Sequence, residues 1–206
     1  MSRHFVICDK ENAKRAEWDK NVGSVSGDCH ICGNKWVSVN ERTTDLYLIL
    51  PNEKEIIDIL WSWYSEIIVT ERVIGIINEN KITGVRFEKV KGVTVKRKKD
   101  VIFKQGLWEL IVENEFKADR KADIQLTEKC NVCDYEAYSP IRHGLIVDEN
   151  EWDGSDFFTI IGYPLLRIVS ERVKTIFEKN KIKNCIFTPA EDYRSWQCKY
   201  ENSNND

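Results

Sequence analysis

The feature that most constrains the fold is a pair of Cys-x-x-Cys sequences placed far apart in the chain. The first is Cys29-His30-Ile31-Cys32-Gly33 and the second is Cys130-Asn131-Val132-Cys133-Asp134, so 97 residues separate Cys32 from Cys130. Two thiolates at this spacing fold into a tight knuckle, and two knuckles supply the four soft ligands of tetrahedral Zn²⁺. The sequence therefore predicts one structural zinc site, which leaves no coordination position for substrate or water and is formed by Cys29, Cys32, Cys130 and Cys133.

A shared site of this kind would join distant segments of the chain. A compact zinc ribbon has roughly 15 to 20 residues between its two pairs, but closing a longer loop costs only about 0.6 kcal/mol per doubling of its length. Structural zinc binds with about 10 to 16 kcal/mol. We therefore expect Cys29→Ser or Cys130→Ser to release the metal and to destabilise the whole body. Two interpretations stay open, namely redox pairs, which require a helix amino terminus in a βαβ unit, and no metal at all.

The three remaining cysteines, Cys8, Cys185 and Cys198, have no partner at metal-binding spacing. The total of seven is odd, and the apolar run from Phe5 to Cys8 is too short for a secretory signal. We therefore expect a cytoplasmic protein whose lone cysteines pack as small hydrophobic residues. His30 is expected to be exposed, since four thiolates already complete the metal shell.

The composition favours a globular fold and argues against several classes of protein. The chain has 206 residues, 42% of them apolar and 32% charged, with only four prolines, so it can bury a substantial core. Basic residues number 31 and acidic residues 34, which gives a net charge of -3 and no overall basic field for nucleic acid or anionic lipid. No apolar run approaches the roughly 18 residues that a membrane-spanning helix needs.

A second similarity within the chain lies at nearly the same spacing as the cysteine pairs. Ile68–Val73 reads IVTERV and recurs as IVSERV over Ile168–Val173, while the cysteine pairs are offset by 101 residues. In each copy, Thr70 or Ser170 can accept a hydrogen bond from the free amides of a first helical turn, and a glutamate follows near the positive helix end. A helix is therefore expected to begin after each of these two residues.

Turn residues and apolar runs indicate where the helices end and strands begin. Both helices should end near Asn80 and Asn180, and Gly84 suits the turn that precedes a strand. Strands are predicted over Lys35–Asn40, Asp45–Leu50, Val85–Val90 and Cys185–Phe187, the last of them ended by Pro189.

The predicted fold class is α+β, an internally duplicated unit of short strands plus one main helix, with two CxxC zinc knuckles joined in one four-cysteine site. Residues 1–200 are expected to form a single pseudo-duplicated zinc-binding body. Repeat 1 covers about 20–114 and repeat 2 about 115–195, and 201–206 form a disordered tail.

The sequence contains no recognisable catalytic constellation. The histidines are His4, His30 and His143, and there is no nucleophile elbow, zinc-protease motif, Walker A loop or dinucleotide fingerprint. We therefore expect a protein that is not an enzyme. The repeated pairs Glu71-Arg72 and Glu171-Arg172 are interpreted as helix-capping and solvated residues.

Two local clusters could contact a partner. The basic run Lys96–Lys99 could touch phosphates, although a solvated hairpin accounts for it and no aromatic residues are interleaved with it. Trp61, Trp63 and Tyr64 lie close together in the sequence. Most tryptophans should be in the core, but exposed Trp and Tyr anchor many protein interfaces.

The two knuckles about one hundred residues apart, the first completed by Gly33, and the repeated I-V-[ST]-E-R-V helix start resemble the double-CxxCG motif family. The second knuckle departs from that motif, since Asp134 stands in place of the glycine. Members of the family are small cytoplasmic bacterial immunity proteins of contact-dependent or polymorphic toxin systems. The resemblance, which spans roughly residues 1–195, implies that the protein binds and neutralises a cognate protein toxin encoded nearby, with a structural zinc and no membrane partner.

Two alternatives to the immunity function remain open. The first is a zinc-ribbon adaptor that binds nucleic acid or another protein, with Lys96–Lys99 as the contact for nucleic acid. The second is a metal-dependent or thiol enzyme, which would need an open coordination site or a cysteine of low pKa. The residues of the partner-binding face and the oligomeric state do not follow from the sequence.

Overall fold

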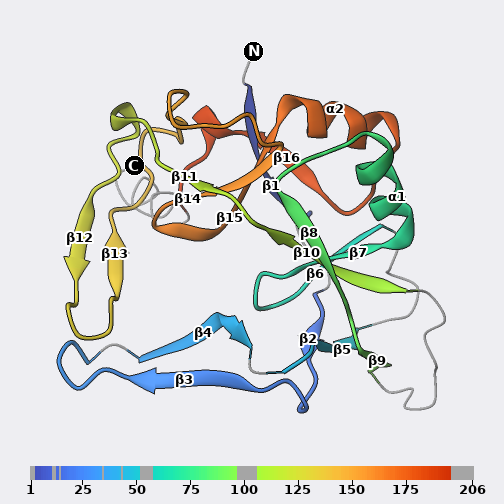
Figure 1. The fold of residues 1–206 in the computed structure, drawn as a ribbon, viewed down its shortest axis with the longest axis horizontal. Helices are drawn as coiled ribbons and strands as arrows, with labels where there is room; N and C mark the ends of the chain where they lie inside the picture. The colour runs from blue at the N-terminus through green and yellow to red at the C-terminus, as the bar shows by residue number, and fades with distance from the viewer. Residues whose placement is uncertain are drawn as a thin grey trace, which may run out of the picture.

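The computed structural model describes residues 3–10, 13, 15–33, 35–42, 44–51, 58–96 and 106–195. It has a mixed α+β fold, with two α-helices at one end of a set of small sheets (Figure 1). The helices are α1 (Glu71–Glu79) and α2 (Glu171–Lys179). The strands in chain order are β1 (His4–Cys8), β2 (Glu17–Trp18), β3 (Ser24–Asp28), β4 (Lys35–Arg42), β5 (Tyr47–Leu50), β6 (Ile59–Trp61), β7 (Ile67–Thr70), β8 (Val85–Lys89), β9 (Gly92–Val95), β10 (Leu107–Val112), β11 (Glu115–Phe116), β12 (Leu126–Lys129), β13 (Glu136–Tyr138), β14 (Phe157–Ile160), β15 (Tyr163–Ser170) and β16 (Ile186–Pro189).

Two larger sheets form the centre of the molecule. One has the strand order β6-β7-β10-β8 and is antiparallel throughout. The other has the order β11-β14-β15-β1-β16, in which only the edge pair β11 and β14 is parallel. A smaller sheet has the order β2-β5-β9, and the hairpins β3-β4 and β12-β13 are separate two-stranded sheets.

The two larger sheets share one spatial arrangement around their helices. β7 leads directly into α1 and β15 into α2, and the strand after each helix is β8 or β16. In the first sheet β10 pairs antiparallel with both β7 and β8, and in the second β1 pairs in the same way with β15 and β16. The strand that pairs with both β15 and β16 is thus the amino-terminal strand β1, which lies outside the range 115–195 predicted for repeat 2.

The helix boundaries agree with the sequence predictions. α1 begins immediately after Thr70 and α2 immediately after Ser170, and the C-caps are Asn80 and Asn180. Each C-cap asparagine donates its side-chain amide to a carbonyl of the last turn, at 2.8 Å in α1 and 2.9 Å in α2. The Ser170 hydroxyl accepts from the backbone N–H of Val173, but Thr70 makes no side-chain cap hydrogen bond, so the capping prediction is wrong for Thr70.

The predicted strands lie where the apolar runs placed them, with small shifts at their ends. β4, β5, β8 and β16 overlap the four predicted ranges. Pro189 is the last residue of β16 and pairs with Phe5. Its lack of an N–H is tolerated because β16 is an edge strand of its sheet.

Three buried apolar clusters hold the sheets and helices together. The first joins the helix residues Val73, Ile77, Val173 and Phe177 to strands of both larger sheets. Cys185 is buried in this cluster, as predicted for a lone cysteine. The second cluster lies around β5 and β7, and the third lies beneath β14 and β15.

The arginines of the repeated Glu-Arg pairs contact buried carboxylates, so the interpretation of these arginines as solvated residues is wrong. Arg72 donates to the buried carboxylate of Asp58 at 2.5 Å and to the carbonyl of Asn180, the C-cap of the opposite helix, at 2.6 Å. Arg172 makes the matching pair of contacts with buried Asp156 and with the Asn80 carbonyl. Each arginine therefore ties one helix start to the end of the other helix.

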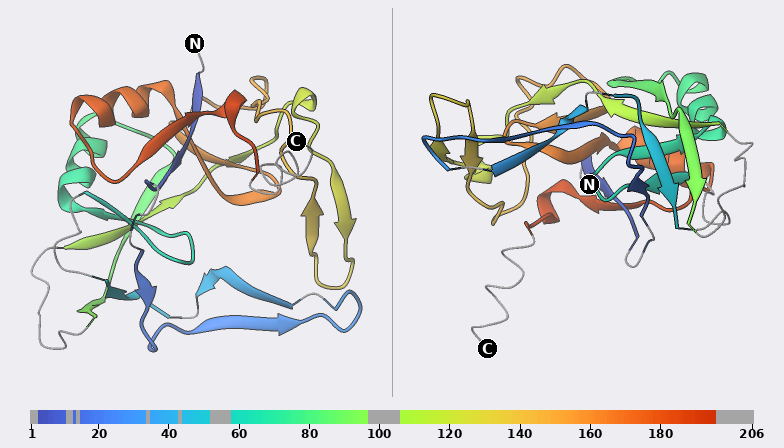
Figure 2. Two further views of the ribbon diagram at one scale, coloured as in Figure 1. Left: turned by 180° about the vertical axis from the view of Figure 1, so that it is seen from behind. Right: turned by 90° about the horizontal axis from the view of Figure 1, so that it is seen from below.

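Two hairpins extend from this body as arms, and their turns meet on one side of the molecule (Figures 1 and 2). The β12-β13 arm is weakly buried, since Leu126–Lys129 is exposed throughout. None of its described residues belongs to the three buried clusters. The β3-β4 arm lies between β2 and β5 in the chain and runs below the body in Figure 1. Together with the body, the two arms outline a ring.

Some sequence predictions fall outside the described residues, namely those for Cys198, for Arg97–Lys99 and for the tail 201–206. Within the described ranges, no helix has both the length and the apolar character that crossing a membrane requires.

Candidate metal centre and adjoining cleft

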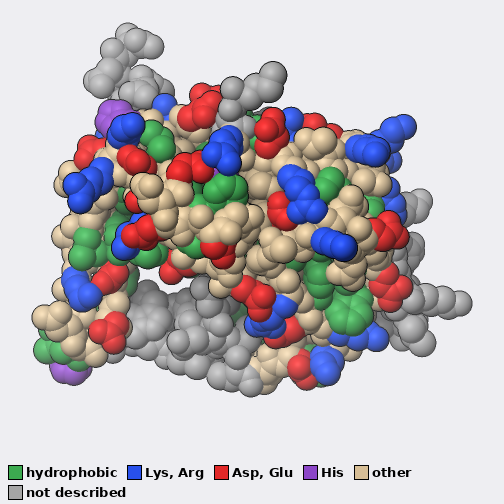
Figure 3. Space-filling model, turned by 45° about the horizontal axis from the view of Figure 1, so that its top comes forward, with side chains coloured by type: hydrophobic (Ala, Val, Ile, Leu, Met, Phe, Trp, Pro, Cys, Tyr) green, Lys and Arg blue, Asp and Glu red, His purple; other side chains and the backbone are tan. Residues whose placement is uncertain are grey.

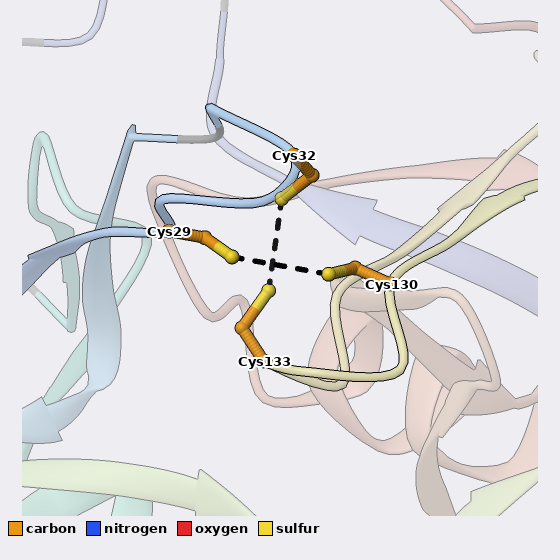
Figure 4. A group of neighbouring side chains, drawn as sticks. All are labelled: Cys29, Cys32, Cys130 and Cys133. Carbon is orange, nitrogen blue, oxygen red and sulfur yellow. Dashed lines mark hydrogen bonds between the residues drawn. The ribbon is translucent and has the colours of Figure 1, made fainter.

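The two predicted cysteine pairs come together where the turns of the two arms meet. The sulfurs of Cys29 and Cys130 lie 3.8 Å apart, and those of Cys32 and Cys133 are also 3.8 Å apart. All four sulfur atoms lie within 4.8 Å of one another and point towards a common centre (Figure 4). The structure therefore places the four predicted ligands in one cluster.

The knuckles are formed by the turn that follows each first cysteine. Gly33 closes the first knuckle by donating its N–H to the Cys29 carbonyl at 2.8 Å, with φ at 67°. Asp134, at the equivalent position of the second knuckle, has φ at 55°. Asp is among the few residues other than glycine that adopt this left-handed conformation without a large penalty. The missing second glycine is thus compatible with the knuckle.

Backbone amides stabilise negative charge on the first cysteine of each pair. The N–H groups of Cys32 and Ile31 donate to the Cys29 sulfur, and they are the main reason that its pKa is lowered to about 6. In the second knuckle the N–H groups of Val132 and Cys133 lower the pKa of Cys130. This is the pattern expected of thiolate ligands.

The last cysteine of the second knuckle behaves differently. The pKa of Cys133 is raised to about 12, chiefly by loss of solvation, while the backbone N–H of Tyr135 opposes the shift and the neighbouring cysteine side chains add to it. Four thiolates at this separation repel one another strongly in the absence of a cation. A bound cation would offset that repulsion. The backbone amides thus stabilise the first thiolate of each knuckle, and a cation would stabilise all four thiolates together.

The geometry fits zinc. Bonds of about 2.3 Å to sulfur in a tetrahedron put the sulfurs about 3.8 Å apart, and the pairs Cys29–Cys130 and Cys32–Cys133 have that separation. A disulfide would need about 2.05 Å between sulfurs, and the four cysteines are free. The redox interpretation is not supported by the surroundings, because both knuckles connect antiparallel strands instead of opening a helix.

The remaining candidates from the sequence lie apart from the cluster. His30 is exposed, as predicted. Cys8 is partly buried, and burial raises the pKa of Cys185 to about 12. Of the basic run, Lys96 lies within the described residues and pairs with Glu17 at 2.9 Å.

A separate cleft of about 1170 Å³ opens on the body and was not predicted from the sequence. Strands of both larger sheets, β5 and the β6-β7 turn supply its described walls. In the space-filling view, a hollow lies along the lower edge of the described body (Figure 3). Six carboxylates and two arginines are among the described lining residues.

Two buried carboxylates and an arginine are among the residues that line this cleft. Glu66 and Glu109 are 6% and 7% exposed. Burial lowers the pKa of the nearby Arg167 guanidinium, and the charges of Glu109 and Glu66 oppose that shift. The sequence does contain a signal for this feature, since Glu109 interrupts the apolar run of β10, LWELIV. A charged residue in a buried strand indicates a polar cavity or a functional site.

No protein-family model matches this chain, and a comparison with curated proteins finds no match either.

Proposed function

We propose that the protein is a cytoplasmic, zinc-stapled binding protein that neutralises a protein toxin, as bacterial immunity proteins of contact-dependent or polymorphic toxin systems do. One observation carries the proposal of a metal site: four sulfurs from two knuckles 101 residues apart lie within 4.8 Å of one another. Cys29, Cys32, Cys130 and Cys133 would hold the ion. When bound, zinc supplies charge balance and a cross-link, and four protein ligands leave it no position for substrate.

An internal duplication is part of the same proposal. It is supported by the repeated IVTERV and IVSERV starts, by the matching strand orders around α1 and α2, and by the reciprocal contacts of Arg72 and Arg172. The two knuckles extend the correspondence, because each arm contributes one of them. Duplication accounts for a site whose two halves lie so far apart in the sequence.

The immunity function rests on the resemblance of these motifs to the double-CxxCG family. A closed four-thiolate site performs no chemistry on a substrate, which suits a protein that acts by binding alone. A rigid binding surface also limits the entropy lost on association. The adaptor alternative gains no support from Lys96, because its ammonium group already pairs with Glu17.

The metal is tested by measuring zinc per chain in protein purified without added metal. Wild-type protein should carry about one zinc per chain. Cys32→Ser should reduce the zinc content sharply, whereas Cys8→Ser, a cysteine outside the cluster, should retain it. Equal zinc content in the two variants, or none in the wild type, would overturn the metal site.

The immunity function is tested by coexpression with the product of the neighbouring reading frame. We expect that product to arrest growth alone and to be harmless when this protein is present, with the two co-purifying as a complex. A harmless neighbour that forms no complex would contradict the proposal. Cys8→Ser should still protect cells.

A further inference from the structure

The last strand of the β6-β7-β10-β8 sheet has one edge with which no described strand pairs. On its other edge β8 is bonded to β10, and Glu113 donates its N–H to the Gly84 carbonyl at 3.1 Å. Further along, Val90 donates to the Leu107 carbonyl at 2.9 Å. Backbone bonding alternates along an antiparallel strand, so every second residue directs its N–H and C=O groups away from the partner strand. In β8 these outward-directed residues are Val85, Phe87 and Lys89.

The open edge is as long as β8 itself. After β8, the N–H of Lys91 donates to the Leu46 carbonyl at 2.9 Å, and β9 then pairs with β5. Before β8, the chain comes from the end of α1, where the Ile82 N–H is bonded to the Ile77 carbonyl. The open edge is therefore confined to Val85–Lys89, a segment of five residues.

The other edges of the two larger sheets are protected. Ala16 covers β6, because it donates to the Trp61 carbonyl and accepts from the Trp63 N–H. β16 ends in Pro189, which has no N–H to offer, and β11 is only two residues long. Proteins commonly block edge strands in such ways to prevent pairing with another chain. Among the described strands at these edges, β8 alone lacks this protection.

The charges on β8 select one way of pairing this edge with itself. Arg86 and Glu88 lie on the same face of the strand, with side chains 47% and 51% exposed. In an antiparallel pair of two β8 strands centred on Phe87, Arg86 of each copy lies directly opposite Glu88 of the other. A centre at Arg86 or at Glu88 would instead place like charges opposite each other, which destabilises a strand pair. The contacts of Arg86 with Glu88 and Glu113 within the chain can remain, so the pairing requires no unpaired charge in the monomer.

The backbone permits this two-fold arrangement. Because Phe87 directs its N–H and C=O outward, it can exchange two hydrogen bonds with Phe87 of the second copy. On either side of the axis, Val85 of one copy would pair in the same way with Lys89 of the other. The interface is then the same surface on both copies, as a closed two-fold dimer requires.

Apolar side chains on the opposite face of β8 would be covered by the same pairing. Val85 and Phe87 pack against the first apolar cluster but remain partly exposed, as does Ile74 of α1. The Phe87 rings of the two copies would meet across the axis, and aromatic cross-strand pairs stabilise a sheet. The pairing thus combines backbone hydrogen bonds, opposite charges on one face and apolar contact on the other.

We propose that two copies of this chain associate through β8 to form a symmetric dimer with one continuous antiparallel sheet. The dimer is a property beyond the proposed neutralisation of a toxin, and it does not depend on the metal. Because Arg86 and Glu88 line the cleft, the dimer would place both clefts on the same face of the joined sheet. The α1 helices of the two copies would lie on the other face, where Val85 and Phe87 pack.

The association is tested by sedimentation velocity of the full, zinc-loaded chain at increasing concentration. A single pair of short strands gives an interface at the small end of the range for specific complexes. We therefore expect a reversible equilibrium in which the dimer accumulates at high protein concentration. A chain that stays monomeric up to millimolar concentration would overturn the proposal.

Charge-swap variants test the register. Arg86→Glu leaves two acidic side chains on β8 and Glu88→Arg leaves basic ones in their place, so each variant alone should dimerise at least about fivefold more weakly. An equimolar mixture of the two variants should restore association, because opposite charges again face each other. A mixture that associates no better than the separate variants would contradict the register. The controls Arg120→Glu and Glu128→Arg change exposed charges outside β8 and should leave dimerisation unchanged, so equal weakening by them would show a general charge effect and overturn the proposed interface.

A proline variant tests the backbone pairing separately. Lys89→Pro removes an N–H that points away from β10, so it should abolish dimerisation while the thermal unfolding midpoint of the dilute protein changes little. The other larger sheet already holds a proline at the matching place, since Pro189 pairs with Phe5 of β1 as Lys89 pairs with Trp108 of β10. Dimerisation that persists in Lys89→Pro would show that the copies meet elsewhere and would overturn the proposal.

Discussion

Thr70 and Ser170 precede the two helices at equivalent positions, yet their hydroxyls differ in their partners. Ser170 accepts from the Val173 N–H and donates to Asp156 at 2.7 Å. The Thr70 hydroxyl is fully buried without a hydrogen-bond partner among the described residues. A buried hydroxyl of this kind costs free energy, whereas a satisfied cap contributes to stability.

Substitutions at these two positions should therefore differ in sign. Ser170→Ala should lower the free energy of unfolding by about 1 to 2 kcal/mol, because it removes a cap and a second hydrogen bond. Thr70→Val keeps the shape and removes the unsatisfied hydroxyl, so it should be neutral or stabilising by up to about 1 kcal/mol. Urea unfolding of both variants checks this. A loss for Thr70→Val as large as that for Ser170→Ala would contradict the assignment.

His4 should make the stability depend on pH as the solution is acidified below about pH 7. Burial lowers its pKa below 6.5, Glu149 opposes that shift, and Arg3 adds to it. On acidification, His4 takes up a proton at a higher pH in the unfolded chain than in the folded one. The contribution of neutral His4 to the free energy of unfolding is therefore fully present above the unfolded pKa and is lost as the pH falls through the folded pKa. His4→Phe, which can still pack between Trp152 and Phe158, should flatten this dependence. An unchanged slope in that variant would rule out His4 as its source.

At the level of residues, the metal ligands could be predicted but the cleft could not. The two cysteines of each knuckle are separated by two residues in the sequence, because each knuckle is a local turn, so the pairs can be recognised from the sequence. The carboxylates of the cleft come from separate strands and loops, such as Glu66, Glu88 and Glu115. No fixed spacing relates them, and only Glu109, placed within an apolar strand, indicates a buried polar site.

At the level of elements, Gly84 shows how closely the two larger sheets meet. Its φ is 82°, and a Cβ at this position would lie 2.1 Å from the Phe157 carbonyl oxygen. That carbonyl belongs to β14 of the other sheet, so a side chain would push the sheets apart. At the equivalent position Asn184 has φ at 68° and donates to the Ile59 carbonyl at 2.7 Å.

Gly84→Ala should therefore destabilise the fold by about 3 kcal/mol or more, because it combines an unfavourable φ with a clash against backbone. Gly75→Ala provides the matched control. Gly75 lies within α1, and apart from the adjoining helix backbone no described atom lies within 4 Å of the position its Cβ would occupy, so alanine there should stabilise by about 0.5 to 1 kcal/mol. Thermal unfolding of both variants checks the prediction, and equal midpoints would contradict it.

The elements themselves were predictable where the signal is local. The starts of α1 and α2 follow from adjacent cap residues, and Asn80 and Asn180 mark their ends. The placement of β1 between β15 and β16 depends on pairing between residues such as Val6 and Ile168, which lie at opposite ends of the chain. Local patterns carry no information about such pairing. The parallel contact of β5 with β9 was missed for the same reason.

At the scale of the whole molecule, the metal cluster closes a ring that the apolar cores do not. The three buried clusters include residues of β1, β5, β7, β14 and both helices. The β12-β13 arm contributes none of its described residues to them and reaches the other arm through the cysteine turns. Zinc would thus cross-link the two arms and act as a clasp between them, whereas the body is stabilised by its own apolar clusters.

Removing the metal should therefore open the ring and leave the body folded, in contrast to the global destabilisation expected from the sequence alone. A zinc chelator, or Cys32→Ser, should abolish the slow hydrogen exchange of amides in Cys29–Gly33 and Cys130–Asp134. Amides of β1, β7 and β15 should stay protected, because the clusters that bury these strands do not depend on the clasp. The main thermal transition should shift by only a few degrees, about what 1 kcal/mol produces in a chain of this size. Cooperative unfolding of the whole chain on chelation would show instead that the clasp is essential to the body.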